Sequence, residues 1–170
     1  MRIKQVGNRS DSVAVVVKSA ESSANIPAGT PLVLAINGTD DGLTVVLPAT
    51  GGNANTGAYP FGVTQAAIAA GMYGEAVVFG IVSNAVLVRG TRAASTDSWT
   101  SSGSFASDVV LMIDTNNNAF VSVGGTLAAT SFAPIAVLVQ SQVSFAASAS
   151  NTSDTRTANT VAVRVFVRML

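Results

Sequence analysis

The chain has 170 residues, of which 48% are apolar and only 11% are charged, and its nine basic and nine acidic side chains give a formal net charge of zero. It contains no histidine and no cysteine, so most acid–base, nucleophilic and zinc chemistry lacks its usual side chains. A neutral chain argues against nucleic-acid binding along a basic surface, and no apolar stretch approaches the roughly 20 residues of a membrane-spanning helix.

The length fits one domain, and we expect residues 1–170 to form a single β-rich domain in which residues 1–12 could be a flexible basic arm. Charge is uneven along the chain. Residues 1–18 carry four basic side chains and one acid, and residues 156–170 carry three arginines and no acid. Solvated loops and chance would explain this distribution. The alternative is that the two basic ends meet and bind an acidic partner.

Short apolar runs rich in strand-forming residues alternate with turn residues about every dozen positions, which is typical of an all-β fold. We predict an antiparallel β-sandwich or β-barrel with long polar loops and little or no helix. The predicted strands, in chain order, are 13–18, 32–36, 43–47, 59–64, 75–82, 85–89, 109–113 and 119–123, one or two strands within 132–145, and a last strand over 160–170.

The connections are predicted from turn chemistry. Ile26–Pro31 contains two prolines and should be a turn before a strand. Ser83–Asn84 predicts a tight hairpin, and Gln65–Ala70 predicts one helical turn at most. Residues 90–106 and 146–159 are polar and are predicted to be long loops.

The last segment, Thr160–Leu170, has valine or methionine at every odd position. This strict period of two predicts a half-buried strand with Arg164 and Arg168 together on its other face. Trp99 lies in the polar loop at 90–106. It could cover the end of a barrel, or it could be an exposed anchor at an interface, where tryptophan is enriched.

None of the residue patterns predicts a reactive site. Asp114–Asn118 begins like a calcium-binding loop, but Ala119 and Gly125 stand where that loop requires glycine and glutamate, so a hairpin turn is favoured. Serine and threonine hydroxyls lack a neighbouring base. We therefore predict no catalytic, cofactor-binding or metal-binding residues and no enzyme activity; a glycosidase or lyase that uses Glu75 is the alternative.

Three segments are more specific than the overall composition, because their residues occur in a recognisable order. They are Ile26–Leu34 (IPAGTPLVL), Phe61–Thr64 (FGVT) and Ile68–Val82 (IAAGMYGEAVVFGIV). Their order resembles the small β-rich head decoration, or capsid cement, proteins of tailed bacteriophages. In that family a proline-alanine-glycine strand entry precedes a Gly-Val strand and then a Gly-Glu-Val strand. The likeness covers about residues 26–90.

The resemblance implies a structural virion protein that binds the outside of a phage capsid and bridges major capsid protein subunits. It also implies a homo-oligomer, with a trimer expected, made in the host cytoplasm and bound to neither nucleic acid nor membrane. Another phage or surface β module, such as a tail, fibre or carbohydrate-binding domain, is the alternative. The candidate partner-contact residues are Arg2, Lys4, Arg9, Trp99, Arg164 and Arg168.

Overall fold

The structure is a computed structural model. It describes residues 3–5, 12–35, 43–48, 59–88, 104–106, 110–114, 118–122, 136–140, 142–144 and 160–168. These residues form strands and no helix, which confirms the predicted all-β class. The strands are β1 (Ile3–Gln5), β2 (Ser12–Ser19), β3 (Pro31–Leu34), β4 (Thr44–Val46), β5 (Pro60–Thr64), β6 (Tyr73–Val88), β7 (Ser104–Ala106), β8 (Val110–Asp114), β9 (Ala119–Ser122), β10 (Ala136–Leu138), β11 (Gln142–Ser144) and β12 (Thr160–Arg168).

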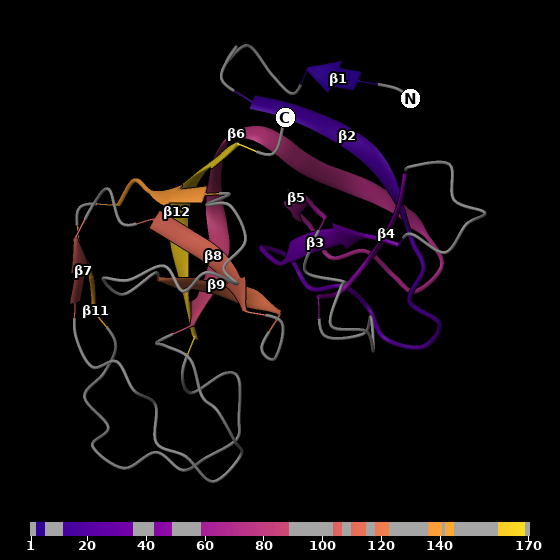
Figure 1. Cartoon of the computed structure of the whole chain (residues 1–170). Coiled ribbons are helices and arrows are strands. Elements are labelled where there is room, and N and C mark those ends of the chain that lie inside the picture. The colour runs from indigo at the N-terminus through magenta and orange to yellow at the C-terminus, as the bar shows by residue number, and fades with distance from the viewer. Residues whose placement is uncertain are drawn as a thin grey trace, which may run out of the picture.

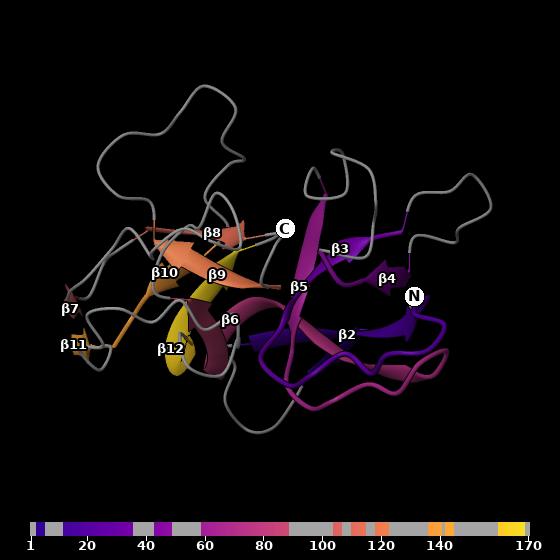
Figure 2. The same ribbon diagram turned by 90° about the horizontal axis from the view of Figure 1, so that it is seen from below.

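Two closed rings of five strands share the long strand β6. The first barrel runs β2, β4, β3, β5 and the first half of β6, and it closes where β6 pairs with β2. The second barrel runs from the second half of β6 through β12, β10, β8 and β9, and it closes where β9 returns to β6. Figures 1 and 2 show the two groups of strands side by side, with β6 passing between them.

The second barrel repeats the connectivity of the first. Each barrel has four antiparallel pairings and one parallel pairing, which is β2 with β4 in the first and β6 with β9 in the second. The registers also correspond at several pairs, although the bulges that shift the register lie at different places in the two barrels. The corresponding pairs are Leu34–Val45 and Leu111–Ser122, Lys18–Thr44 and Val88–Val121, and Val15–Ala76 and Ala85–Val163.

The hairpin predicted at Ser83–Asn84 is wrong, because both residues lie inside the continuous strand β6. Ala85 is opposite Val163 and Val82 is opposite Val165, so the Ser83–Asn84 pair faces a single residue of β12. This is a β-bulge, which absorbs an extra residue and bends the strand without ending it. The side-chain amide of Asn84 donates a hydrogen bond to the Gln65 carbonyl (3.0 Å), so Asn84 links the bulge to the segment that follows β5.

The predicted turn at Ile26–Pro31 is present and lies against β6. Gly29 has φ +72°, its N–H donates to the Thr64 carbonyl (2.8 Å), and its carbonyl accepts from the N–H of Val86 (2.8 Å). The Thr64 hydroxyl donates to the Pro27 carbonyl (2.7 Å) and accepts from the N–H of Thr30 (3.0 Å). The turn of the first barrel is thereby bonded to the half of β6 that belongs to the second barrel.

Elsewhere the predictions hold in part. The hairpin around Asp114–Asn118 is confirmed by the pairing of β8 with β9. Gln65–Ala70, where at most one helical turn was predicted, contains no helix, and Ile68 forms a β-bridge with Ile26. Part of the loop predicted at 90–106 is the short strand β7, which pairs with β11, and the loop predicted at 146–159 lies outside the described residues.

One apolar core extends through both barrels. It contains residues of β2, β3, β5 and the first half of β6, and it continues without a break into β8, β9, β10 and β12. A second cluster fills the other end of the first barrel, around Val17, Leu32 and Ile68. The shared core and the shared strand mean that the barrels do not pack as separate units.

Candidate partner-binding surface

The last strand, β12, presents a basic and aromatic outer face. Val163, Val165 and Val167 are buried in the second barrel. Between them Arg164 and Arg168 are exposed and Phe166 is half-buried. This is the period of two that was predicted for the segment, and the predicted common face of the two arginines is confirmed.

Neighbouring strands extend this outer face. Phe166 lies opposite Ile81 of β6 and opposite Val137 of β10, while Arg168 lies opposite Phe79 of β6, which in turn lies opposite Val13 of β2. Val139, just after β10, donates its N–H to the Arg164 carbonyl (3.0 Å) and is 39% exposed. We call this surface the Phe–Arg face, and its members are Val13, Phe79, Ile81, Val137, Val139, Arg164, Phe166 and Arg168.

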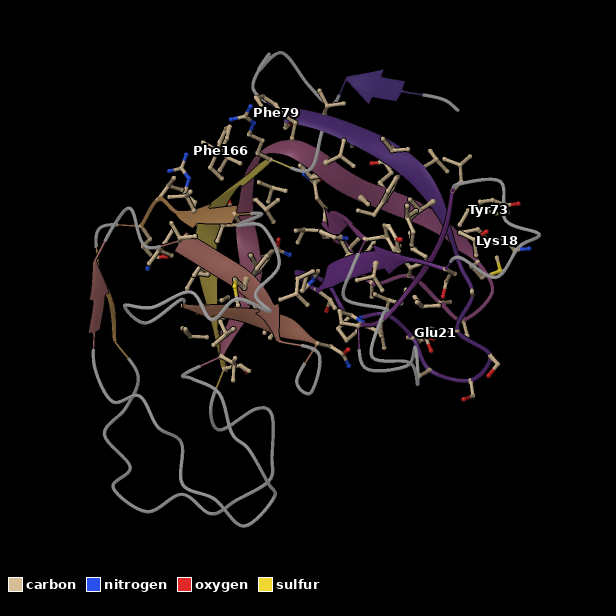
Figure 3. The ribbon with its side chains drawn as sticks, in the orientation of Figure 1. Lys18, Glu21, Tyr73, Phe79 and Phe166 are labelled. Atoms are coloured by element: carbon tan, nitrogen blue, oxygen red, sulfur yellow. The ribbon has the colours of Figure 1, made fainter. Side chains whose placement is uncertain are left out.

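Two aromatic rings lie at its centre. The ring centroids of Phe79 and Phe166 are 5.2 Å apart, and their planes meet at 80°, an edge-to-face geometry that aromatic pairs favour. Figure 3 shows the two rings next to each other on the outside of the sheet. Phe79 remains 36% exposed. Because the rings are nearly perpendicular, this pair does not form a flat platform of the kind on which a sugar ring stacks.

A second exposed apolar surface lies at the start of β6. Tyr73 is 69% exposed and Met72 is 58% exposed, and the exposed Lys18 of β2 lies opposite Tyr73. Backbone bonds from Ser19 N–H to the Met72 carbonyl (2.9 Å) and from Met72 N–H to the Ala69 carbonyl (3.0 Å) hold the turn. We call Lys18, Met72 and Tyr73 the Tyr–Met end, and Figure 3 shows Lys18 and Tyr73 far from the phenylalanine pair.

The predicted contact residues are distributed unevenly. Arg164 and Arg168 come together on the Phe–Arg face, and Lys4 lies in β1 opposite Ala14. Arg2, Arg9 and Trp99 lie outside the described residues. The strands β1, β2, β6 and β12 lie side by side in that order, so β1 and β12 are about 14 Å apart at the usual strand spacing.

Sequence reasoning missed the aromatic members of the Phe–Arg face. The predicted contact residues include neither Phe79 nor Phe166. A usable signal was present, because Phe166 falls in the same phase of the alternation as Arg164 and Arg168. The contact between Phe166 and Phe79 depends on pairing between β6 and β12, which are far apart in the sequence.

The two glutamates of the chain lie in or next to strands. Glu21 is buried, and its Oε1 accepts a hydrogen bond from the N–H of Leu47 (2.8 Å). Glu75 is half-buried in β6 opposite Val16. Among the described residues no three side chains of histidine, cysteine, aspartate or glutamate lie close enough to hold a metal ion. The same residues include no helix with the length and apolar character of a membrane span.

No protein-family model matches the chain, and no curated protein sequence is significantly similar to it.

Proposed function

We propose that this protein is a structural component of a bacteriophage virion, which binds the outer surface of the capsid and stabilises it by bridging major capsid protein subunits. The main support for the proposal is that two exposed surfaces, each with apolar and basic side chains, both include residues of the same long strand, β6. The Phe–Arg face includes Phe79 in the middle of β6, and the Tyr–Met end includes Tyr73 at its start. The resemblance of residues 26–90 to capsid cement proteins supports the same function.

The strand β6 holds these two surfaces at a fixed separation. Its first half is bonded to β2 and β5 and its second half to β12 and β9, so it cannot flex as a free linker would. The six residue-to-residue steps from Tyr73 to Phe79 span about 20 Å at the rise of an extended strand. A molecule that contacts two subunits at such a separation gains affinity from the simultaneous engagement of both sites.

We further propose that the protein acts as a homo-oligomer, with a trimer as the expected state. Several copies that are joined together multiply weak contacts on a repeating surface such as a capsid. Light scattering on the purified protein measures this state directly, and a monomer at micromolar concentration would contradict the proposed oligomer.

The proposal is tested by cosedimentation with purified phage heads that lack the protein, together with the temperature at which those heads disrupt. The wild-type protein is expected to bind and to raise the disruption temperature. A variant with Met72→Ser and Tyr73→Ser retains the Phe–Arg face, so it should still bind but should stabilise the heads much less. Ser22→Ala, a change at an exposed site of the first barrel, is the matched control and should behave as wild type.

Failure of the wild-type protein to bind heads would refute the capsid function. Strong and specific binding to a glycan array by the same preparation would favour a carbohydrate-binding module instead. Equal stabilisation of heads by wild-type protein and by the Met72→Ser and Tyr73→Ser variant would show that the Tyr–Met end does not contribute to bridging.

A further inference from the structure

We infer that the Phe–Arg face docks an extended, acidic segment of the partner protein in which an apolar residue stands between two acidic residues. The inference rests on the proposed function, because it describes the part of a capsid subunit that this face would recognise. It is carried by the arrangement of Arg164, Phe166 and Arg168 along β12 and by the neighbours that surround them.

The charge of the face is of one sign. Arg164 and Arg168 are exposed, and none of the eight members of the face is acidic, so the face itself supplies no counter-charge. Guanidinium groups bind carboxylates through two parallel hydrogen bonds, with more directional specificity than lysine provides. A partner that brings carboxylates to this surface is therefore favoured over a neutral or basic partner.

The spacing along β12 defines the order of side chains in the partner. Alternate residues of a strand share a face, so Arg164 and Arg168 are about 13 Å apart with Phe166 midway between them. An extended segment of the partner has the same period. Acidic residues at its first and fifth positions would meet the arginines, while an apolar residue at its third position would cover Phe166.

The side chains around Phe166 present apolar surface that such a residue could cover. Phe79 and Val139 remain 36% and 39% exposed, and Ile81 and Val137 are half-buried beside them. Covering these side chains removes apolar surface from water, which is favourable, and aromatic and arginine side chains are the types most enriched at binding hot spots. The arginines would then set the position of the segment while the phenylalanine pair contributes affinity.

Another copy of the chain is a weaker candidate for the occupant. A symmetric contact of the Phe–Arg face with itself would bring the arginines of one copy toward those of the other, and like charges repel. The Tyr–Met end offers one basic side chain, Lys18, and no second cation at a strand spacing among the described residues. The acidic segment is therefore assigned to the Phe–Arg face.

The first arm of the test uses a peptide with the sequence Gly-Glu-Thr-Leu-Thr-Glu-Gly and follows the amide NMR signals of the full-length protein. Saturable shifts are expected in Phe79–Ile81 and in Arg164–Arg168, and they should weaken as salt is raised. A peptide with both glutamates replaced by glutamine is the matched control. Equal shifts with the two peptides, shifts confined to other strands, or stronger binding of an oligonucleotide of equal charge would overturn the inference.

The second arm uses variants and purified heads. Arg164→Gln combined with Arg168→Gln is expected to weaken both peptide and head binding at least tenfold, and the two lysine substitutions should restore part of the loss. Lys18→Gln, which removes one charge from the Tyr–Met end, should change peptide binding less than twofold. Peptide binding that depends on the arginines without any binding to heads would refute the capsid function alone, whereas head binding that does not depend on the arginines would refute this inference alone.

Discussion

Gly29 occupies a position that accepts no side chain. Its φ of +72° lies in the region that L-residues rarely adopt, and a Cβ there would overlap the backbone carbonyl oxygen of Asn84. Gly71 has nearly the same φ, +70°, but a Cβ there would meet nothing within 4 Å. Alanine variants at the two positions therefore distinguish two costs: both variants carry backbone strain, but only the Gly29 variant also carries a steric overlap.

Gly29→Ala is expected to destabilise the protein by at least about 1 kcal/mol more than Gly71→Ala, the usual contribution of one hydrogen bond. Both variants gain the strain of a left-handed alanine, about 1–2 kcal/mol, but only Gly29→Ala must also push the Ile26–Pro31 turn away from β6. That movement weakens the hydrogen bond from Val86 to Gly29, at about 1 kcal/mol for each bond lost. Urea unfolding measures the difference, and equal losses for the two variants would contradict this account of Gly29.

At the scale of elements, Glu21 connects the ends of two strands. It follows β2, and its Oε1 accepts from the N–H of Leu47, which follows β4 (2.8 Å). The main-chain N–H of Glu21 donates to the hydroxyl of Ser19 (3.2 Å). Both Glu21 and Leu47 are buried, so water cannot readily replace the carboxylate as the acceptor.

Glu21→Ala is expected to lower the free energy of unfolding by about 1–3 kcal/mol, the usual effect of leaving a buried N–H without its acceptor. Glu21→Gln keeps an oxygen at the same position and should lose clearly less. Chemical denaturation of both variants at neutral pH gives the comparison. If the glutamine variant lost as much stability as the alanine variant, the hydrogen bond to Leu47 would not be the source of the effect.

The strands that could be predicted are those marked by a pattern within a few consecutive residues. The alternation in β12 identified its buried face and both exposed arginines, and the Asx-rich turn identified the hairpin between β8 and β9. The interruption at Ser83–Asn84 was misread because a bulge and a turn use the same polar residues, and only the pairing with β12 distinguishes them. The closing parallel pairings of β2 with β4 and of β6 with β9 depend on contacts between distant residues, which no local pattern encodes.

The candidate site could likewise be predicted only where its residues lie close together in the sequence. Arg164 and Arg168 were found from a single strand. The phenylalanine pair, which gives the face its apolar centre, joins two strands whose pairing could not be read from local residues.

At the scale of the whole molecule, the continuous core predicts one cooperative unfolding transition. Leu32 is buried in the first barrel and Leu111 in the second, each with no exposed surface. Replacement of either by alanine should cost about 2–5 kcal/mol. Leu111 belongs to the core that passes from one barrel to the other. Leu32 belongs to the second cluster of the first barrel, but its neighbour in β3, Val33, belongs to the continuous core, so each variant should lower the midpoint of the same single transition.

Differential scanning calorimetry, with agreement between the calorimetric and van't Hoff enthalpies as the criterion, measures this cooperativity. Two resolved transitions, with Leu32→Ala moving one of them and Leu111→Ala moving the other, would show that the barrels unfold independently in spite of the shared strand.

The shared strand also determines how an error in folding would spread. A slip of one residue reverses the faces of a strand, so a wrong register between β6 and β2 would turn Ala85 and Leu87 away from the second barrel. All strands of the first barrel precede or include the first half of β6, so that barrel can form before the later strands are synthesised. In that order of folding, the first barrel would be the template against which β12 aligns, and errors in the first barrel would carry over to the second.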